Sequence, residues 1–332
     1  MYKVGIVGVT GAVGLEFLKV LKDRRFPIKE LRVFASERSK GREILWGDER
    51  LRVEVPSYEN FKGLDLLFFT AGAKVSLEYV PIAVKAGAIV IDNSSAFRME
   101  KDVPLVVPEV NGESIEYPRG IIANPNCSTI QLVMVLYPLH RVAGLKRVVV
   151  STYQAVSGAG LRAIEELKRE TRKVLEGEEP TSEVFPHPIA FEALPHIDIF
   201  QEYDYTKEEW KIIKETRKIL GLPDLRITAT AVRIPVIRGH SESVNVEFER
   251  ELSVEEAREA LRRFPGVVVL DNPKEKIYPL ARICENRYEV FVGRIRRDLS
   301  VEHGLNLWIV SDNLLKGAAL NAVQIAESLI KS

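Results

Sequence analysis

The chain contains two cysteines, and one of them lies where a thiol can react. Cys127 belongs to the sequence NPNCST at 124–129, directly before the apolar run at 130–139. The proline and asparagine that precede it are common at helix starts, so Cys127 is predicted in the first helical turn. There the helix dipole and the backbone N–H groups favour the reactive thiolate. The alternative is an unreactive structural cysteine, which is our interpretation of Cys284.

A glycine-rich loop near the N-terminus predicts binding of a dinucleotide. The sequence GVTGAVG at 8–14 lies between a strand-like run at 3–7 and a helical pattern at 12–22. Glycines at this position allow a tight turn and bring backbone N–H groups close to a pyrophosphate at a helix N-terminus. A plain turn between strand and helix is the alternative. The residues predicted to contact the cofactor here are Gly8, Thr10, Gly11, Ala12 and Val13.

The sequence FASERSKG at 34–41 bears on the choice of cofactor. NAD sites usually place an acidic residue after the second strand, and Glu37 is available for that role. Ser36, Arg38 and Ser39 surround it, however, and two hydroxyls with a guanidinium suit a 2′-phosphate. We therefore expect NADP, and the alternative is an ordinary polar surface loop.

Strand and helix patterns change in character along the chain. The first third alternates apolar strands with helices, which predicts a parallel sheet of βαβ units. Further along, the runs at 241–249 and 305–309 alternate apolar and polar residues, which is typical of strands with one solvent-exposed face in a mixed or antiparallel sheet. The last segment, at 314–330, is predicted to be one amphipathic helix. Charged helices with solvated faces are expected at 163–175, 207–220 and 254–263.

Length and composition limit the possible partners and locations. The 332 residues suggest two domains, and Lys+Arg 47 balances Asp+Glu 47. Because no basic surplus exists, nucleic acid is not an expected partner. The longest apolar runs, at 64–73 and 130–139, are too short to span a bilayer. The N-terminus runs straight into a strand without a signal peptide, so we expect no membrane association and a cytoplasmic location.

Several motifs together resemble one enzyme family. They are the glycine loop at 8–14, DNSSAFR at 92–98, NPNCST at 124–129, YQAVSGAG at 153–160, and RIPV at 233–236 followed by GHSE at 239–242. In this order they cover essentially the whole chain, and they resemble the aspartate-semialdehyde dehydrogenases. The resemblance implies an α/β fold, with a Rossmann-type parallel sheet domain plus a mixed α+β catalytic and dimerisation domain.

The resemblance also implies a reaction. These enzymes reduce L-aspartyl 4-phosphate to L-aspartate 4-semialdehyde with NADPH and release inorganic phosphate, in lysine, threonine and methionine biosynthesis. By analogy, Cys127 attacks the acyl phosphate and forms a thioester, which accepts hydride more readily than a carboxylate does. His240, at a predicted strand mouth, is implied as the general acid/base. Gln154 is implied as the residue that orients the acyl group.

Further residues are implied to hold the small-molecule substrate. Arg233 should bind the α-carboxylate through its planar fork, and Glu208 the amine, with Glu209 as the alternative for the amine. Arg98 and Lys211 should hold the phosphate. For Glu208 and Lys211, an ordinary surface ion pair is the competing interpretation.

The domain plan and the assembly follow from the same resemblance. The NADP-binding domain is expected at 1–126, completed by the C-terminal helix at 312–332, and the catalytic and dimerisation domain at 127–311. A homodimer or a tetramer of dimers is expected, and no metal. The residues implied near the nicotinamide are Ser157, Gly158 and Asn313.

Three alternative functions stay open at this point. N-acetyl-γ-glutamyl-phosphate reductase runs the same chemistry on a longer substrate without a free amine, for which Glu208 would have no purpose. Its cysteine segment also usually lacks the second asparagine, here Asn126. An acyl-CoA reductase would not need two phosphate-holding cations. A non-catalytic NADP-binding sensor would carry an unreactive thiol, which alkylation across pH would reveal.

Overall fold

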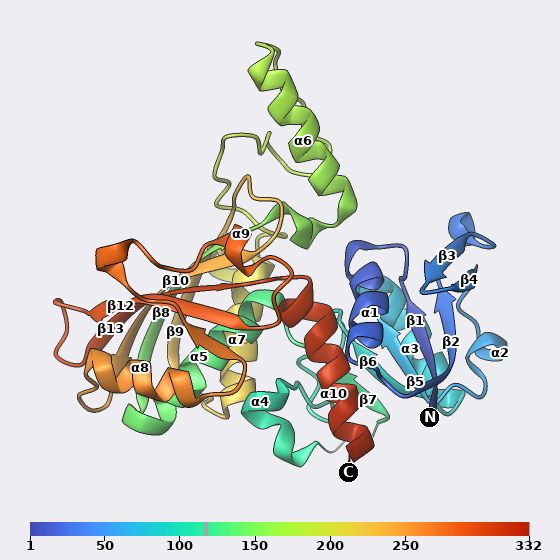
Figure 1. Ribbon diagram of the computed structural model, residues 1–332, viewed down its shortest axis with the longest axis horizontal. Helices are drawn as coiled ribbons and strands as arrows, with labels where there is room; N and C mark the ends of the chain where they lie inside the picture. Colours follow the sequence, from blue (N-terminus) through green and yellow to red (C-terminus); the bar gives the residue numbers. More distant parts are fainter. Residues whose placement is uncertain (116–118, 332) are drawn as a thin grey trace. The chain divides into compact units, whose positions relative to one another are not determined.

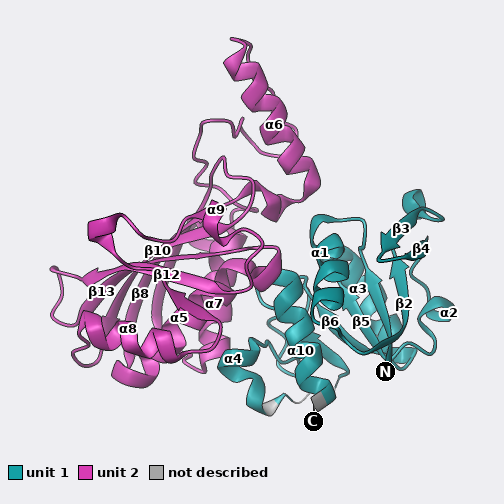
Figure 2. Cartoon of the chain, viewed as in Figure 1, with its two compact units in different colours: residues 1–126, 318–332 teal, residues 127–317 magenta. Residues whose placement is uncertain are grey.

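The computed structural model describes residues 1–115 and 119–331 of the chain. It divides into two compact units, Met1–Asn126 with Ala318–Ser332, and Cys127–Gly317 (Figures 1 and 2). We call them unit 1 and unit 2. Each unit has its own sheet, so the chain leaves the first sheet once and returns to it with its last helix.

Unit 1 is built on a seven-stranded sheet in the order β3-β4-β2-β1-β5-β6-β7. Its strands are β1 (Tyr2–Val7), β2 (Ile28–Phe34), β3 (Glu43–Trp46), β4 (Glu49–Glu54), β5 (Leu66–Phe69), β6 (Ile89–Asp92) and β7 (Ile121–Ala123). Its helices and single turns are α1 (Ala12–Asp23), η1 (Glu37–Ser39), α2 (Tyr58–Phe61), α3 (Ala73–Lys85), α4 (Pro108–Asn111), η2 (Gly112–Ser114) and α10 (Leu320–Lys331). Neighbouring strands pair in parallel except β3 with β4, which confirms the predicted Rossmann-type sheet.

The strand order of unit 1 reverses at β1. β2 and β4 lie on one side of β1, and β5 and β6 lie on the other. In open α/β sheets, ligands bind at the carboxyl ends of the strands where the order reverses. The loop that follows β1 is the glycine loop, so the fold places this loop at the expected ligand position.

Aromatic packing holds the helices of unit 1 to its sheet. All four residues of β5 are buried, as an apolar run without alternation predicts. The Phe68 ring lies 4.8 Å from the ring of Phe17 on α1, and the ring of Phe34 on β2 lies 5.2 Å from that of Phe61 on α2. Each buried side chain of this size contributes about 1.5–3 kcal/mol to stability, which fixes α1 and the loop before it against the sheet.

Unit 2 is built on a six-stranded mixed sheet in the order β11-β12-β13-β10-β8-β9. Its strands are β8 (Leu145–Gln154), β9 (Arg226–Arg233), β10 (His240–Phe248), β11 (Val267–Val269), β12 (Val290–Arg297) and β13 (Gly304–Ser311). Its helices and turns are α5 (Cys127–Ala143), η3 (Val156–Ala159), α6 (Leu161–Leu175), η4 (Glu202–Asp204), α7 (Lys207–Leu220), α8 (Val254–Arg263), η5 (Pro273–Glu275), α9 (Ala281–Cys284) and η6 (Leu315–Ala319). Burial alternates along β9 and β10, which confirms the predicted mixed sheet with one less buried face.

Helix α5 is the central helix of unit 2. It contacts α7, α8 and four strands of the sheet, β8, β10, β12 and β13. Nearly all of its residues from Ser128 to Leu139 are buried, so its first residue, Cys127, is held by a rigid element. Although α5 is apolar, no helix in residues 1–115 and 119–331 is long and apolar enough to cross a membrane.

The prediction of one amphipathic helix at 314–330 is confirmed for its C-terminal part and wrong for its first turns. The segment begins as the π-helix η6, continues as α10, and is buried on all sides from residue 314 to 323. The reason is tertiary packing, because α10 lies against α1, α4 and β6 of unit 1. The compact units separate after Gly317, whereas the return to the first domain was placed at 312.

The prediction that charges on the helices form solvated faces is wrong for part of α6 and α7. Glu166 and Glu170 of α6 are 1% and 0% exposed, and Glu208, Glu209 and Glu215 of α7 are also buried. Hydrophobic periodicity cannot reveal Glu166 and Glu170 as buried, because backbone groups distant in the sequence hold their carboxylates.

We predict that Gly14→Ala destabilises the protein. An alanine Cβ at this position would lie 2.3 Å from the carbonyl oxygen of Gly8 and 2.6 Å from Cα of Val9. Glycine to alanine in a helix normally stabilises, but backbone atoms cannot move aside here, so we expect a loss of about 1–3 kcal/mol. Denaturant unfolding measures it. Gly11→Ala is the control, because its Cβ would meet only an oxygen at 3.4 Å; equal stability of both variants would contradict the packing described.

Candidate active site

Three predicted site residues meet at one edge of the sheet in unit 2. Parallel pairing of β8 with β9 puts Gln154 opposite Arg233 at the ends of both strands. Antiparallel pairing of β10 with β8 puts Ser241 opposite Tyr153. His240, the first residue of β10, therefore lies beside Gln154. The sheet register brings together side chains that are up to 86 residues apart in the sequence.

The side-chain amide of Gln154 is held in one orientation. Gln154 is 1% exposed, and its Oε1 accepts a hydrogen bond from Thr152 Oγ1 at 3.1 Å. Its Nε2 donates to Glu208 Oε1 at 3.2 Å and lies 3.5 Å from His240 Nε2. Because oxygen and nitrogen have separate partners, the amide group is fixed at the centre of the cluster.

His240 is fully buried, and its surroundings determine its protonation. The backbone N–H of Ala155 donates to Nδ1 at 3.0 Å, so a neutral ring carries its proton on Nε2. Burial lowers the pKa of His240 to about 3; the charge of Arg233 also lowers it, and Glu208 opposes the shift. The imidazole is therefore neutral near pH 7 and presents an Nε2–H donor.

Arg233 is a buried cation with anions around it. It is 6% exposed, and its Nη1 donates to the Ala155 carbonyl at 2.7 Å. The Phe185 ring covers the guanidinium, with 5.8 Å between its centroid and Cζ. Burial lowers the pKa of Arg233, and the negative charges of Glu208 and of a Cys127 thiolate raise it. By the same interaction, Arg233 favours the thiolate form of Cys127.

Cys127 begins helix α5, as the preceding proline and asparagine predict, and its side chain is partly exposed. A Cβ added to Gly317, in the π-helix η6, would lie 3.0 Å from Cβ of Cys127. The N–H of Gly317 bonds to the Asp312 carbonyl at 3.1 Å, which holds the glycine there. The thiol therefore has access on one side and a glycine backbone against the other, at a helix end that favours negative charge.

Glu208 and Lys211 lie in the first turns of α7 and form a charged group with Asp198, in which Glu208 is buried, Lys211 partly buried and Asp198 exposed. Glu208 is 5% exposed, and its Oε2 lies 3.0 Å from Lys211 Nζ. Asp198 Oδ2 lies 2.9 Å from the same ammonium. Burial alone would lower the pKa of Lys211, but Glu208 and Asp198 together raise it. Glu208 thus joins this ion pair to Gln154.

Glu209, the alternative to Glu208, has a structural role. Its carboxylate accepts the N–H of Thr206 at 2.7 Å, and Thr206 Oγ1 accepts the N–H of Glu209, which is a capping box. The other oxygen accepts the N–H of Ala231 at 2.9 Å. Since both oxygens are occupied in this way, Glu208 is the acid that faces the cluster.

Ser157, Gly158 and Asn313 lie next to His240 and Arg233. Asn313 accepts the N–H of Gly239 at 2.9 Å and donates to Ser157 Oγ at 2.9 Å. A Cβ at Gly158 would lie 3.0 Å from Arg233 Nη1 and 3.3 Å from His240 Nε2. Asn313 thus links the turn before His240 to η3, and Gly158 leaves space in front of the two functional side chains.

The glycine loop of unit 1 opens onto a pocket of about 500 Å³. Gly8 has a φ of +96°, and a Cβ there would lie 2.9 Å from backbone atoms of Thr70 and Ala71. Only glycine permits this close approach of two strand ends. The predicted contact residues that line the pocket are Gly8, Thr10, Gly11 and Ser36, together with Glu37. The predicted contact residues that do not line it are Ala12, Val13, Arg38 and Ser39.

Arg98 belongs to unit 1, whereas the other predicted substrate residues belong to unit 2. It is 6% exposed, and its guanidinium donates to the backbone carbonyls of Asn124 at 2.9 Å and Asn93 at 2.8 Å. Arg98 therefore ties together the ends of β6 and β7. Its predicted contact with phosphate stays a prediction.

Sequence reasoning missed several residues that contact the cluster. Thr152 could have been found, because a residue two positions before Gln154 on a strand points to the same face. Asp198, Phe185 and Gly317 carry no local signal, since only the fold brings them to Lys211, Arg233 and Cys127. In the described part of the chain, no group of three or more acidic, histidine or cysteine residues could hold a metal ion.

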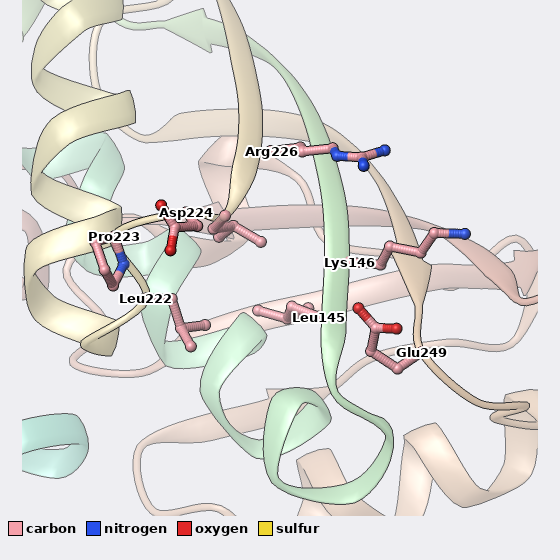
Figure 3. A pocket seen from close by; sticks show the side chains of 8 residues that line it. Leu145, Lys146, Leu222, Pro223, Asp224, Arg226 and Glu249 are labelled. Atoms are coloured by element: carbon pink, nitrogen blue, oxygen red, sulfur yellow. The ribbon is translucent and has the colours of Figure 1, made fainter.

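A second hollow of about 460 Å³ lies at the opposite end of the same strands (Figure 3). Lys146 near the start of β8 and Arg226 at the start of β9 line it, roughly 25 Å along the strands from the cluster. The ends of both side chains point away from Asp224, which also lines the hollow. It offers no convergent polar groups, and it is separate from the site.

Gly158→Ala should impair catalysis without unfolding the protein. The new methyl group would push Arg233 Nη1 or the His240 ring by a few tenths of an ångström. Misplacement of this kind lowers kcat/KM on the order of tenfold. The measurement is an assay of the dehydrogenase reaction that the resemblance implies. Gly112→Ala is the control, because its Cβ would meet only Pro108 at 3.4 Å. Full activity of the Gly158 variant would contradict this geometry.

Two family models match the chain. "Semialdehyde dehydrogenase, NAD binding domain" matches residues 3–117, and "Semialdehyde dehydrogenase, dimerisation domain" matches residues 136–316. Among individual proteins, aspartate-semialdehyde dehydrogenase of Aquifex aeolicus is 57% identical over 334 residues, covering 99% of this chain and 98% of the relative.

Solved structures show the same similarity. Aspartate semialdehyde dehydrogenase II from Vibrio cholerae, complexed with ASA, superposes with a TM-score of 0.97 and 43% identity, covering 100% of this chain and 99% of the other. The Candida albicans enzyme with NADP has a TM-score of 0.77 and 27% identity, covering 99% and 98%. On this evidence, the chain belongs to the aspartate-semialdehyde dehydrogenase family.

Proposed function

We propose that this chain is an NADP-dependent aspartate-semialdehyde dehydrogenase that reduces L-aspartyl 4-phosphate to L-aspartate 4-semialdehyde through a thioester on Cys127. The reaction serves lysine, threonine and methionine biosynthesis. One observation carries the proposal: Cys127 begins a buried helix and interacts electrostatically with the buried Arg233, which itself lies against His240 and Gln154. Membership of the family supports it.

The first step is acyl transfer to Cys127. The thiolate Sγ bonds to the acyl carbon, the bond from that carbon to the phosphate oxygen breaks, and inorganic phosphate leaves with the electron pair. The helix N-terminus and Arg233 favour the thiolate that this step needs. Gln154, whose amide is held by Thr152 and Glu208, orients the acyl group.

The second step reduces the thioester. When bound, NADPH supplies the hydride. The chain's own contribution is the Nε2–H of His240, which stabilises the negative oxygen on the reacting carbon as a neutral donor. Collapse of this oxygen to the aldehyde returns the thiolate to Cys127. His240 is therefore proposed as a proton-bearing donor at Nε2, a narrower role than general acid/base.

The charged residues of unit 2 suit the substrate. Arg233 can offer its planar fork to the α-carboxylate, and Glu208 a carboxylate to the amine. Lys211, together with Arg98, is proposed to bind the phosphate. A free amine is what distinguishes this substrate from that of N-acetyl-γ-glutamyl-phosphate reductase, and the buried Glu208 favours the amine-bearing substrate.

The two compact units are proposed to divide the work. Unit 1, completed by the C-terminal helix α10, binds NADP, and unit 2 carries catalysis and dimerisation. Supporting observations are the glycine loop at the strand-order reversal, the close backbone approach at Gly8, and the family models for NAD binding and for dimerisation. A homodimer, or a tetramer of dimers, is the proposed assembly.

The choice of substrate has a direct test. We expect phosphate-dependent reduction of NADP with aspartate semialdehyde, and a kcat/KM for N-acetylglutamate semialdehyde lower on the order of 10²-fold, because Glu208 finds no amine there. Cys127→Ser, with a weaker nucleophile in the same place, controls for uncatalysed reduction. A preference for the acetylated aldehyde would overturn the proposal, and no turnover of either would favour the non-catalytic sensor.

For the cofactor, we expect a higher kcat/KM with NADPH than with NADH. Ser36 lines the pocket and Arg38 lies two residues on, exposed at η1, where it can reach a 2′-phosphate. Arg38→Ala should raise KM for NADPH roughly tenfold and leave KM for NADH within about twofold. Lys40→Ala, which removes a neighbouring exposed cation, serves as control. A clear preference for NADH would contradict the NADP proposal. In that case Glu37, which lines the pocket, would be the residue that binds the ribose hydroxyls of NAD.

A further inference from the structure

Part of the segment between α6 and α7, residues 183–198, contacts the cluster without forming a helix or strand of its own. We call residues 183–198 the strap; apart from one isolated bridge at Leu194, they have no regular pairing. A segment this long without secondary structure in a compact domain needs another source of order. The contacts of the strap with α6 and with Arg233 supply it.

Two buried carboxylates on α6 hold the backbone of the strap. Glu166 accepts the N–H groups of Glu183 at 2.9 Å, Val184 at 2.8 Å and Phe185 at 3.2 Å. These are charge-assisted hydrogen bonds, which are roughly twice as strong as neutral ones. Because three consecutive N–H groups point at one carboxylate, the backbone at Phe185 has a single conformation.

The second carboxylate is one helical turn further along α6. Glu170 Oε2 accepts the N–H groups of Ile189 at 2.7 Å and Ala190 at 3.0 Å. Ile189 and Ala190 also pack in an apolar cluster with Leu167 of α6 and Leu194 of the strap. In Figure 1, α6 extends away from the sheet of unit 2, and the strap joins it to the site together with Val156 of η3.

The strap contacts the cations that we assign to the substrate. The Phe185 ring covers the guanidinium of Arg233, and Leu194 exchanges two backbone hydrogen bonds with Arg233, at 2.9 Å and 2.8 Å. At its end, Asp198 Oδ2 lies 2.9 Å from Lys211 Nζ. The strap therefore contacts both the guanidinium face and the backbone of Arg233. It also restrains the ammonium group of Lys211.

We propose that Glu166 is a positioning residue for substrate recognition, which acts by holding the Phe185 ring on Arg233. The ring excludes water from the guanidinium and limits its rotation, so that its planar fork is already aimed when the substrate carboxylate arrives. This inference rests on the proposed function, because it takes Arg233 as the carboxylate-binding residue. Glu170 fixes the next part of the strap in the same way.

Glu166→Gln keeps the size of the side chain but removes the charge and one acceptor oxygen. We expect KM for aspartate semialdehyde to rise about tenfold, the value of one desolvated cation–π contact, with kcat and KM for NADP within about twofold. Glu165→Gln is the matched control: its side chain is 70% exposed and pairs with Lys168 at 2.9 Å. It should leave both constants unchanged.

Phe185→Leu tests the same link without touching α6. It keeps an apolar side chain but loses the ring face, so KM for aspartate semialdehyde should rise by a similar factor. If Glu166 acts through Phe185, the double variant is no worse than Phe185→Leu alone. Phe185→Leu also decides the matter if Glu166→Gln fails to fold.

An unchanged KM in either folded variant, or additive effects in the double variant, would overturn the inference. The wild-type chain, assayed in parallel, separates this outcome from a failure of the proposed function. If the wild type does not reduce NADP with aspartate semialdehyde, the function proposal fails. If it does, and the variants match it, only the role of Glu166 is wrong.

Discussion

The burial of the Arg233 guanidinium is the constraint on which the site in unit 2 depends. A buried cation is costly unless it has hydrogen bonds and nearby negative charge. Here the Ala155 carbonyl and the Phe185 ring satisfy part of the group, and Glu208 and Cys127 provide the negative charge. Arg233 therefore attracts anions, and in the proposed reaction these are the thiolate of Cys127 and the substrate carboxylate.

The same charge explains the state of His240. Burial and the neighbouring guanidinium both disfavour the imidazolium, and the N–H of Ala155 fixes the tautomer. In the unfolded chain the pKa of this histidine is the ordinary value of about 6.5. In the folded chain the pKa of His240 is lowered to about 3. Below about pH 6.5 the unfolded chain takes up a proton that the folded chain does not, so the burial of His240 destabilises the folded state as the pH falls. At pH values well above 3 the ring is therefore a neutral donor.

Much of this arrangement could be predicted from local sequence. The glycines at 8–14 lie between β1 and α1, and Cys127 begins α5, because turns and helix starts depend on neighbouring residues. The mixed sheet could be predicted from the alternation of apolar and polar residues along β10 and β13. His240, Gln154 and Arg233 came from the family resemblance, and the strand register explains why they meet.

What could not be predicted depends on partners distant in the sequence. Glu166 and Glu170 look like solvated charges on α6, and only the backbone of the strap makes them buried anchors. The π-helix η6 is a local departure that lets Gly317 approach Cys127, and its sequence reads as an ordinary helix. Asp198 reaches Lys211 through an irregular segment that has no periodic pattern at all.

The central claim is that Cys127 is a thiolate nucleophile activated by its helix end and by Arg233. The most direct measurement is the rate of iodoacetamide alkylation of Cys127 as a function of pH, followed by mass spectrometry. Cys284 is an internal reference, because burial raises its pKa to about 12. The account predicts that Cys127 reacts with a half-maximal rate well below pH ~8.5, the value of a free thiol. Reaction only near or above pH ~8.5 would contradict it.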